Sequence, residues 1–137
     1  LLVRPHPQGV PHTMDYIYFV ALLAVGQFIY FGILVGQARG KYDVKAPAVS
    51  GNENFDRIFR VQMNTQEQLV CFLPALLIAG HYCPSIWVAL VGAVYLVGRF
   101  IYQRSYVADP ASRSTGFALS IVPTLVLLLI GLIGAIF

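Results

Sequence analysis

Charged side chains are scarce in this sequence. Only 11% of its 137 residues are charged and 58% are hydrophobic, whereas about a quarter of the residues in soluble domains are charged. A short chain has a large surface for its volume and would need more polar side chains to stay in water, not fewer. The composition therefore nearly excludes a soluble globular domain and a disordered chain. It favours the lipid bilayer as the surroundings of most side chains.

Cysteine and runs of positive charge are scarce too. The two cysteines, Cys71 and Cys83, form no Cys-x-x-Cys pair, which argues against a disulfide framework or a redox relay. No run of Lys and Arg indicates nucleic-acid binding. Phosphate-binding loops and zinc-protease motifs are missing from the sequence as well. We therefore expect neither a metal nor a nucleic acid as a partner.

Long apolar runs predict membrane-spanning helices. Residues 17–36 contain Gln27 as the only strongly polar member, and residues 117–137 carry no charge. A transmembrane helix needs about 20 such residues. Two shorter apolar stretches, residues 69–80 and 86–98, are long enough only if each helix includes its polar flank. Four helices follow, two of them wholly apolar.

These segments predict an all-α integral membrane protein, with one four-transmembrane-helix bundle over residues 14–137. The expected helices cover about 15–38, 54–81, 85–108 and 110–137. For the last helix, Asp109 supplies an N-cap and Pro110 the first helical position. Residues 1–13 precede Met14 and lack the apolar core of a signal peptide. We expect them to be a leader that is either disordered or foreign to the natural chain.

The positive residues predict the orientation in the membrane. Eight of the nine Lys and Arg residues flank the first and third loops, Arg4 is the exception, and none flanks the second loop. Cytoplasmic loops carry the excess of Lys and Arg in membrane proteins. We therefore expect loops one and three in the cytoplasm and both termini on the opposite side. A bacterial inner membrane is favoured, with the endoplasmic reticulum as the alternative.

Polar residues at helical spacing give the strongest functional signal. One set lies on the second expected helix and comprises Arg57, Arg60, Asn64, Glu67 and Cys71. The other lies on the third and comprises Tyr95, Arg99, Tyr102 and Tyr106. Steps of three and four residues place each set on one helix face. A charge inside the bilayer costs about 2.5–3.5 kcal/mol on insertion scales, so such residues normally face a partner or a cavity.

The chemistry of these two stripes suits a polar ligand. Several guanidinium groups, one carboxylate, an amide and phenols match a ligand with several carboxylates and one ammonium group. Arg60 is two turns from Glu67, so Arg99 or the ligand is the expected partner of Glu67. Structural roles stay open for single members: Tyr106 could belong to an aromatic belt, and Gln62 could lie in an interfacial first turn. The joint pattern favours a site.

Two segments resemble motifs of the family of membrane-associated proteins in eicosanoid and glutathione metabolism (MAPEG). Residues 54–67 match the pattern F-x-R-x-x-R-x-Q-x-N-x-x-E of its second helix, and residues 92–106 are similar to its third-helix motif. The resemblance extends over most of residues 14–137. It is closest to the branch that holds leukotriene C4 synthase, microsomal glutathione transferases 2 and 3 and the 5-lipoxygenase-activating protein.

The resemblance implies a membrane-bound glutathione S-transferase with a role in detoxification, and a glutathione-dependent peroxidase as a related activity. It also implies a homotrimer with sites between neighbouring subunits near the cytoplasmic face. Glutathione would be the co-substrate, no metal is implied, and the second substrate would be a lipophilic molecule from the membrane lipid. The expected glutathione-binding residues are Arg39, Arg60, Gln62, Asn64, Glu67, Arg99, Tyr102 and Tyr106. Arg113 falls where the catalytic, glutathione-activating arginine is expected.

Departures from the family pattern bear on the substrate. Gly40 stands in place of the second arginine of the first-helix pair in leukotriene C4 synthase, and Gln68 in place of a tyrosine. These differences argue against leukotriene A4 and favour a broader transferase or peroxidase.

The main alternative is a non-catalytic lipid-binding protein like the 5-lipoxygenase-activating protein. That protein lacks counterparts of Arg60 and Arg113, which this sequence has. A small multidrug transporter is disfavoured, because the first helix holds Gln27 and no buried glutamate.

Overall fold

Four long helices and one 3-10 turn make up the described part of the chain, residues 8–9 and 11–137, in a computed structural model. The elements are α1 (Thr13–Tyr42), α2 (Glu53–Tyr82), α3 (Ile86–Ala108), η1 (Pro110–Ser112) and α4 (Ser114–Ile136). No strand occurs within these described residues. Most of the expected leader, with Arg4, lies outside them. The expectation of an all-helical chain is confirmed for these described residues.

Local side-chain bonds explain where the helices begin. The Asn52 side chain accepts hydrogen bonds from the N–H groups of Asn54 and Phe55 at the start of α2. Ser85 does the same for the N–H of Trp87 at the start of α3. Such caps satisfy backbone donors that have no partner within the helix. Both helices therefore begin beside a polar residue that the sequence supplies.

The last helix differs from the expected range of 110–137. Residues Pro110–Ser112 form a 3-10 turn, and α4 begins only at Ser114. The Asp109 carboxylate accepts from the N–H of Ala111, while the Ser112 hydroxyl donates to the carbonyl of Asp109 at 2.7 Å. These short-range bonds close a separate turn before α4 can start. The N-cap at Asp109 is real, but it caps this turn.

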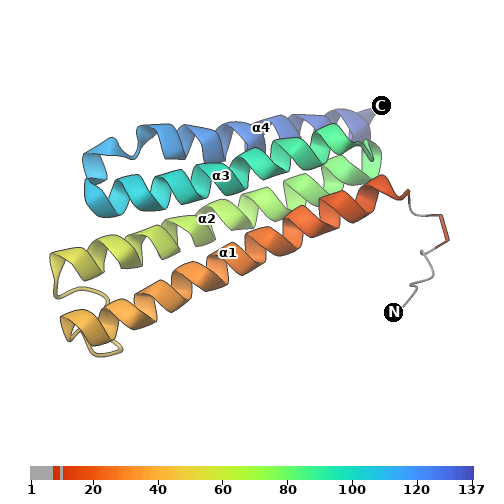
Figure 1. Cartoon of the computed structure of the whole chain (residues 1–137). Coiled ribbons are helices and arrows are strands. Elements are labelled where there is room, and N and C mark those ends of the chain that lie inside the picture. Colours follow the sequence, from red (N-terminus) through yellow and green to blue (C-terminus); the bar gives the residue numbers. More distant parts are fainter. Residues whose placement is uncertain (1–7, 10) are drawn as a thin grey trace.

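The four helices lie side by side and antiparallel (Figure 1). The α1–α2 loop and η1 lie at one end of the bundle, and the α2–α3 turn and the C-terminus lie at the other (Figure 1). We call the first of these the cationic end, because the Lys and Arg residues of both connections gather there. Loops one and three therefore lie at the same end of the bundle (Figure 1).

Large apolar side chains cover the outside of the bundle. Phe19, Leu22, Trp87 and Leu129 are all more than half exposed, which a bilayer accommodates and water does not. Among the described helices, α1, α3 and the segment Pro110–Ile136 are long and apolar enough to cross a membrane. The helix α2 is not in this group, because its first half carries most of the polar stripe.

Glycines let α3 and α4 approach closely. A Cβ added at Gly98 would lie 2.6 Å from the carbonyl carbon of Leu119, and one at Gly116 would overlap the backbone of Tyr102. Real Cβ atoms do not occupy such positions. Helix contacts in membranes depend on small residues in this way. The two glycines therefore hold the beginning of α4 against the polar half of α3.

We predict that Gly98→Ala lowers the midpoint of thermal unfolding in detergent. The added methyl group must push α4 away, and such overpacking costs about 1–3 kcal/mol. The control is Gly26→Ala on α1, where the new Cβ has no described atom within 4 Å apart from its chain neighbours and the nearby backbone of α1. Alanine favours a helix over glycine by about 0.5–1 kcal/mol, so the control should unfold at the same or a higher temperature. Equal midpoints for the two variants would contradict the close contact.

Candidate functional site

An open polar groove of about 560 Å³ lies between α2, α3 and the beginning of α4 at the cationic end. Its lining consists of Arg60, Asn64, Tyr102, Tyr106, Arg113, Ser114 and Phe117. The structure thus brings together five of the residues that the sequence nominated for a site. They come from three different elements, so they meet only when the bundle forms.

Two exposed guanidinium groups give the groove its charge. Arg60 projects from α2 and Arg113 stands at the N-cap position of α4. The first turn of α4 adds a partial positive charge from its unpaired N–H groups. The groove lining contains no carboxylate. The groove is therefore suited to an anionic ligand.

Two tyrosines form a rigid wall of the groove. The Tyr102 side chain is buried, and its ring stacks on that of Tyr106 with centroids 5.5 Å apart and an angle of 19° between the planes. The guanidinium carbon of Arg99 lies 4.2 Å from the centroid of the Tyr102 ring. A cation over an aromatic face is attracted by the ring's quadrupole. The ring of Tyr102 is thus held by contacts with both Tyr106 and Arg99.

Arg99 is fully buried behind this wall, at 0% exposure. Its Nη2 donates to Thr65 Oγ1 at 2.9 Å and to Asn64 Oδ1 at 3.0 Å, and its Nη1 donates to Ser120 Oγ at 3.3 Å. These acceptors come from α2 and α4, so one side chain connects three helices. Arg99 does not line the groove; it supports the residues that do.

The bond from Arg99 orients the amide of Asn64. Because Asn64 Oδ1 accepts from the guanidinium, the amide nitrogen is left as a donor. Asn64 is half-buried and lines the groove. A carbonyl or carboxylate of a ligand is the natural partner of that free donor.

Arg99 was one expected partner of Glu67, and that expectation is wrong. Glu67 is exposed on α2, and no ion pair joins it to Arg99 among the described residues. The guanidinium is satisfied instead by hydroxyl groups of Thr65 and Ser120, which lie deeper in the bundle. Glu67 thus remains available to other partners.

Two further nominated residues lie away from the groove in this chain. Gln62 is on another side of α2, where its Nε2 would be 2.8 Å from a Cβ at Gly32 of α1. Arg39 donates to the carbonyl of Ala48 at 2.6 Å, and its guanidinium carbon is 5.0 Å from the centroid of the Phe55 ring. One chain therefore assembles part of the nominated set and leaves Arg39, Gln62 and Glu67 outside.

Some residues of the site were not nominated from the sequence. Ser114 and Phe117 line the groove. The spacing of four residues between Arg113 and Phe117 is a helical signal that could have found Phe117, whereas Ser114 gives no such signal. Thr65 and Ser120 support Arg99 from behind. Nothing in the sequence distinguishes these two hydroxyls from the other Ser and Thr residues of the helices.

A second hollow, of about 430 Å³, lies between α2 and α4 farther from the cationic end. Its lining is almost entirely apolar and includes Cys71, Leu127 and Leu132. The chain therefore offers an apolar surface on the same pair of helices that frames the polar groove.

Comparison with known proteins shows the family of the chain. The model of the MAPEG family matches residues 17–133. Microsomal glutathione S-transferase 2 of Homo sapiens is 39% identical over 115 residues, which cover 84% of this chain and 78% of that protein. Leukotriene C4 synthase of Rattus norvegicus is 36% identical over 94 residues, which cover 69% of this chain and 63% of that protein. An uncharacterized protein of Synechocystis is 42% identical over 108 residues, 79% of each chain.

We predict that Thr65→Val destabilises the protein by about 1–3 kcal/mol, because the buried guanidinium of Arg99 loses an acceptor that valine cannot replace. The measurement is the midpoint of thermal unfolding in detergent. Thr115→Val is the matched control, since Thr115 is exposed at the beginning of α4. A loss of the same size in both variants would show that the acceptor at Thr65 is unimportant.

Proposed function

Because the chain belongs to the MAPEG family, we propose that it is a membrane-bound glutathione transferase. In this proposal it presents glutathione as a thiolate to lipophilic electrophiles, or to hydroperoxides, from the bilayer. The observation that carries the proposal is the groove that joins Arg60, Asn64 and Arg113 with two stacked tyrosines. The similarity to microsomal glutathione S-transferase 2 supports it.

The charges of the groove suit glutathione, which has two carboxylates and one ammonium group. Arg60 is placed to bind a carboxylate, and the Asn64 amide to donate to the peptide backbone of the ligand. Glu67, exposed two residues past Thr65, is suited to the ammonium group. In this proposal Arg113 lies beside the sulfur.

The proposed chemistry is ionisation of the thiol followed by nucleophilic attack. A free thiol has a pKa of about 8.5, and a neighbouring cation stabilises the thiolate. Arginine suits this role because it stays protonated. The sulfur then forms a bond to the electrophilic carbon while the leaving group departs with its electron pair. The protein supplies position and charge, which are the main sources of rate here.

We predict different kinetic effects for the two exposed arginines of the groove. Arg113→Gln should lower kcat about 100-fold by removing charge beside the sulfur, with a small change in the KM for glutathione. Arg60→Gln should weaken glutathione binding about tenfold, as expected for one lost bond to a charged group. The assay is conjugation of glutathione to a halonitrobenzene by detergent-purified protein.

Arg104→Gln is the control for that assay, since Arg104 is an exposed cation of α3 outside the groove. It should behave as the wild type. If the wild-type protein shows neither conjugation nor a rise in unfolding temperature with glutathione, the transferase proposal fails.

We further propose that the protein is a homotrimer in which neighbouring subunits complete each site. Gln62 lies on another side of α2 from the groove, and Arg39 lies near the α1–α2 loop. Neither reaches the groove of its own chain, but a second copy could bring both to it.

We also propose that residues 14–137 form one domain and that all four helices cross the membrane. In this proposal the cationic end faces the cytoplasm, and the membrane is a bacterial inner membrane.

Mixed oligomers test this shared site. Arg113→Ala and Gln62→Ala are each expected to lose most of the activity when expressed alone. When the two are co-expressed in equal amounts, a site made of an intact Arg113 and a neighbour's intact Gln62 should form in about a quarter of cases. Turnover should then recover to about that fraction of wild type. Purification through two different tags checks that mixing occurred, and no recovery in verified mixed oligomers would contradict the shared site.

A second candidate function is lipid binding without catalysis, as in the 5-lipoxygenase-activating protein. The apolar hollow between α2 and α4 favours it. Arg60 and Arg113 in the polar groove count against it. Binding of a fatty-acid probe in the absence of any glutathione effect would make it the better interpretation.

A further inference from the structure

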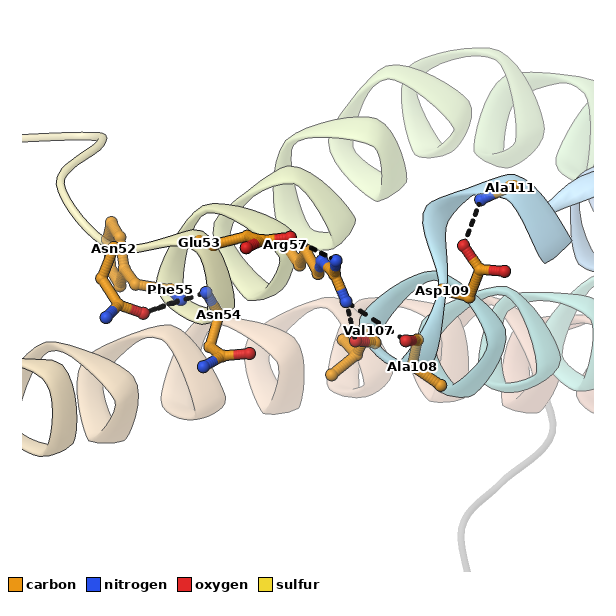
Figure 2. A network of polar contacts seen from close by, with 9 residues as sticks. All are labelled: Asn52, Glu53, Asn54, Phe55, Arg57, Val107, Ala108, Asp109 and Ala111. Carbon is orange, nitrogen blue, oxygen red and sulfur yellow. Dashed lines mark hydrogen bonds and ion pairs between the residues drawn. The ribbon is translucent and has the colours of Figure 1, made fainter.

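Arg57 lies outside the groove, but it holds the end of α3 that leads into the groove. It projects from the second turn of α2, and its Nη1 donates to the carbonyls of Val107 at 3.3 Å and Ala108 at 3.1 Å (Figure 2). Its Nη2 donates to the carboxylate of Glu53, one turn earlier (Figure 2). One guanidinium group therefore bridges α2 and the last residues of α3.

The two carbonyls that Arg57 binds need a partner from outside α3. The last four carbonyls of a helix have no N–H partner within it. In α3 the carbonyl of Ser105 accepts from the N–H of Asp109 and from the Ser112 hydroxyl. The carbonyls of Val107 and Ala108 accept from the guanidinium of Arg57 instead. A cation at this position also interacts favourably with the negative end of the helix dipole.

Two residues of the groove flank the bridged segment, Val107 and Ala108. Tyr106 directly precedes Val107, and Arg113 follows the turn η1 that Asp109 caps. A neighbouring hollow of about 470 Å³ has Arg57 in its lining and shares Arg60 and Tyr106 with the groove. The bonds of Arg57 therefore fix the part of the backbone on which the position of Arg113 depends.

We infer that Arg57 is a positioning residue that keeps Arg113 in reach of the ligand sulfur by capping the C-terminus of α3. This inference rests on the proposed function. Glu53 assists by orienting the guanidinium, because its carboxylate accepts a hydrogen bond from Nη2 of Arg57. Arginine is required because its planar fork serves two carbonyls and a carboxylate together, and a lysine ammonium reaches fewer of these acceptors.

The test compares Arg57→Gln and Arg57→Lys with the wild type in detergent, using glutathione and a halonitrobenzene. We expect kcat of Arg57→Gln to fall about tenfold, with the KM for glutathione changed less than about twofold. The midpoint of the pH–rate profile should move to higher pH, because a displaced Arg113 stabilises the thiolate less. Arg57→Lys should recover part of both effects. Arg104→Gln also removes one positive charge near the end of α3, and it should leave kcat and the pH midpoint unchanged.

The pH profile separates positioning from a merely structural role. If Arg57→Gln lowers only the unfolding temperature and the yield, with kcat and the pH midpoint of the folded protein unchanged, the inference is overturned. Equal effects of Arg104→Gln would overturn it too, since net charge would then be the cause. Failure of the proposed function is distinct, because it is seen as absence of glutathione binding and conjugation in the wild-type protein.

Discussion

The structure depends on one charged side chain that is sealed inside a bundle of apolar helices. Arg99 has no exposed surface, and no carboxylate neutralises it among the described residues. A buried charge without partners would be strongly destabilising. Hydroxyl and amide oxygens from α2 and α4, with the face of Tyr102, supply those partners instead. Any arrangement of the helices that separated these groups would expose Arg99 to hydrocarbon.

The close approach of α3 and α4 follows from the same requirement. Ser120 reaches the guanidinium only because Gly98 and Gly116 allow the two backbones to touch. The same contact places the first turn of α4, and with it Arg113, beside the stacked tyrosines. The contact between α3 and α4 therefore determines both the packing of the helices and the shape of the groove. Residues with no contact to a ligand decide where the groove residues lie.

The sequence predicts the helices and much of the groove, because apolar run length and helical spacing are local properties. Spacing correctly placed Arg60 and Asn64 on the same side as the groove. It could not tell how deep each residue of a stripe lies, so Arg99 and Tyr102 looked equivalent although only Tyr102 lines the groove. The acceptors Thr65 and Ser120 were not predictable, because their role arises from contacts between helices. The 3-10 turn at residues 110–112 was not predicted, because an N-cap followed by proline can begin either a 3-10 turn or an α-helix.

The different exposure of the three arginines has a consequence for how an anion is captured. At physiological ionic strength charges in water are screened within about 8 Å, so Arg60 and Arg113 attract a ligand only when it is already near the mouth of the groove. Arg99 is out of reach of counterions, and its field acts on the groove wall at any salt concentration. Salt should therefore weaken the attraction of Arg60 and Arg113 for an anion, while it leaves the contact between Arg99 and Tyr102 nearly unchanged.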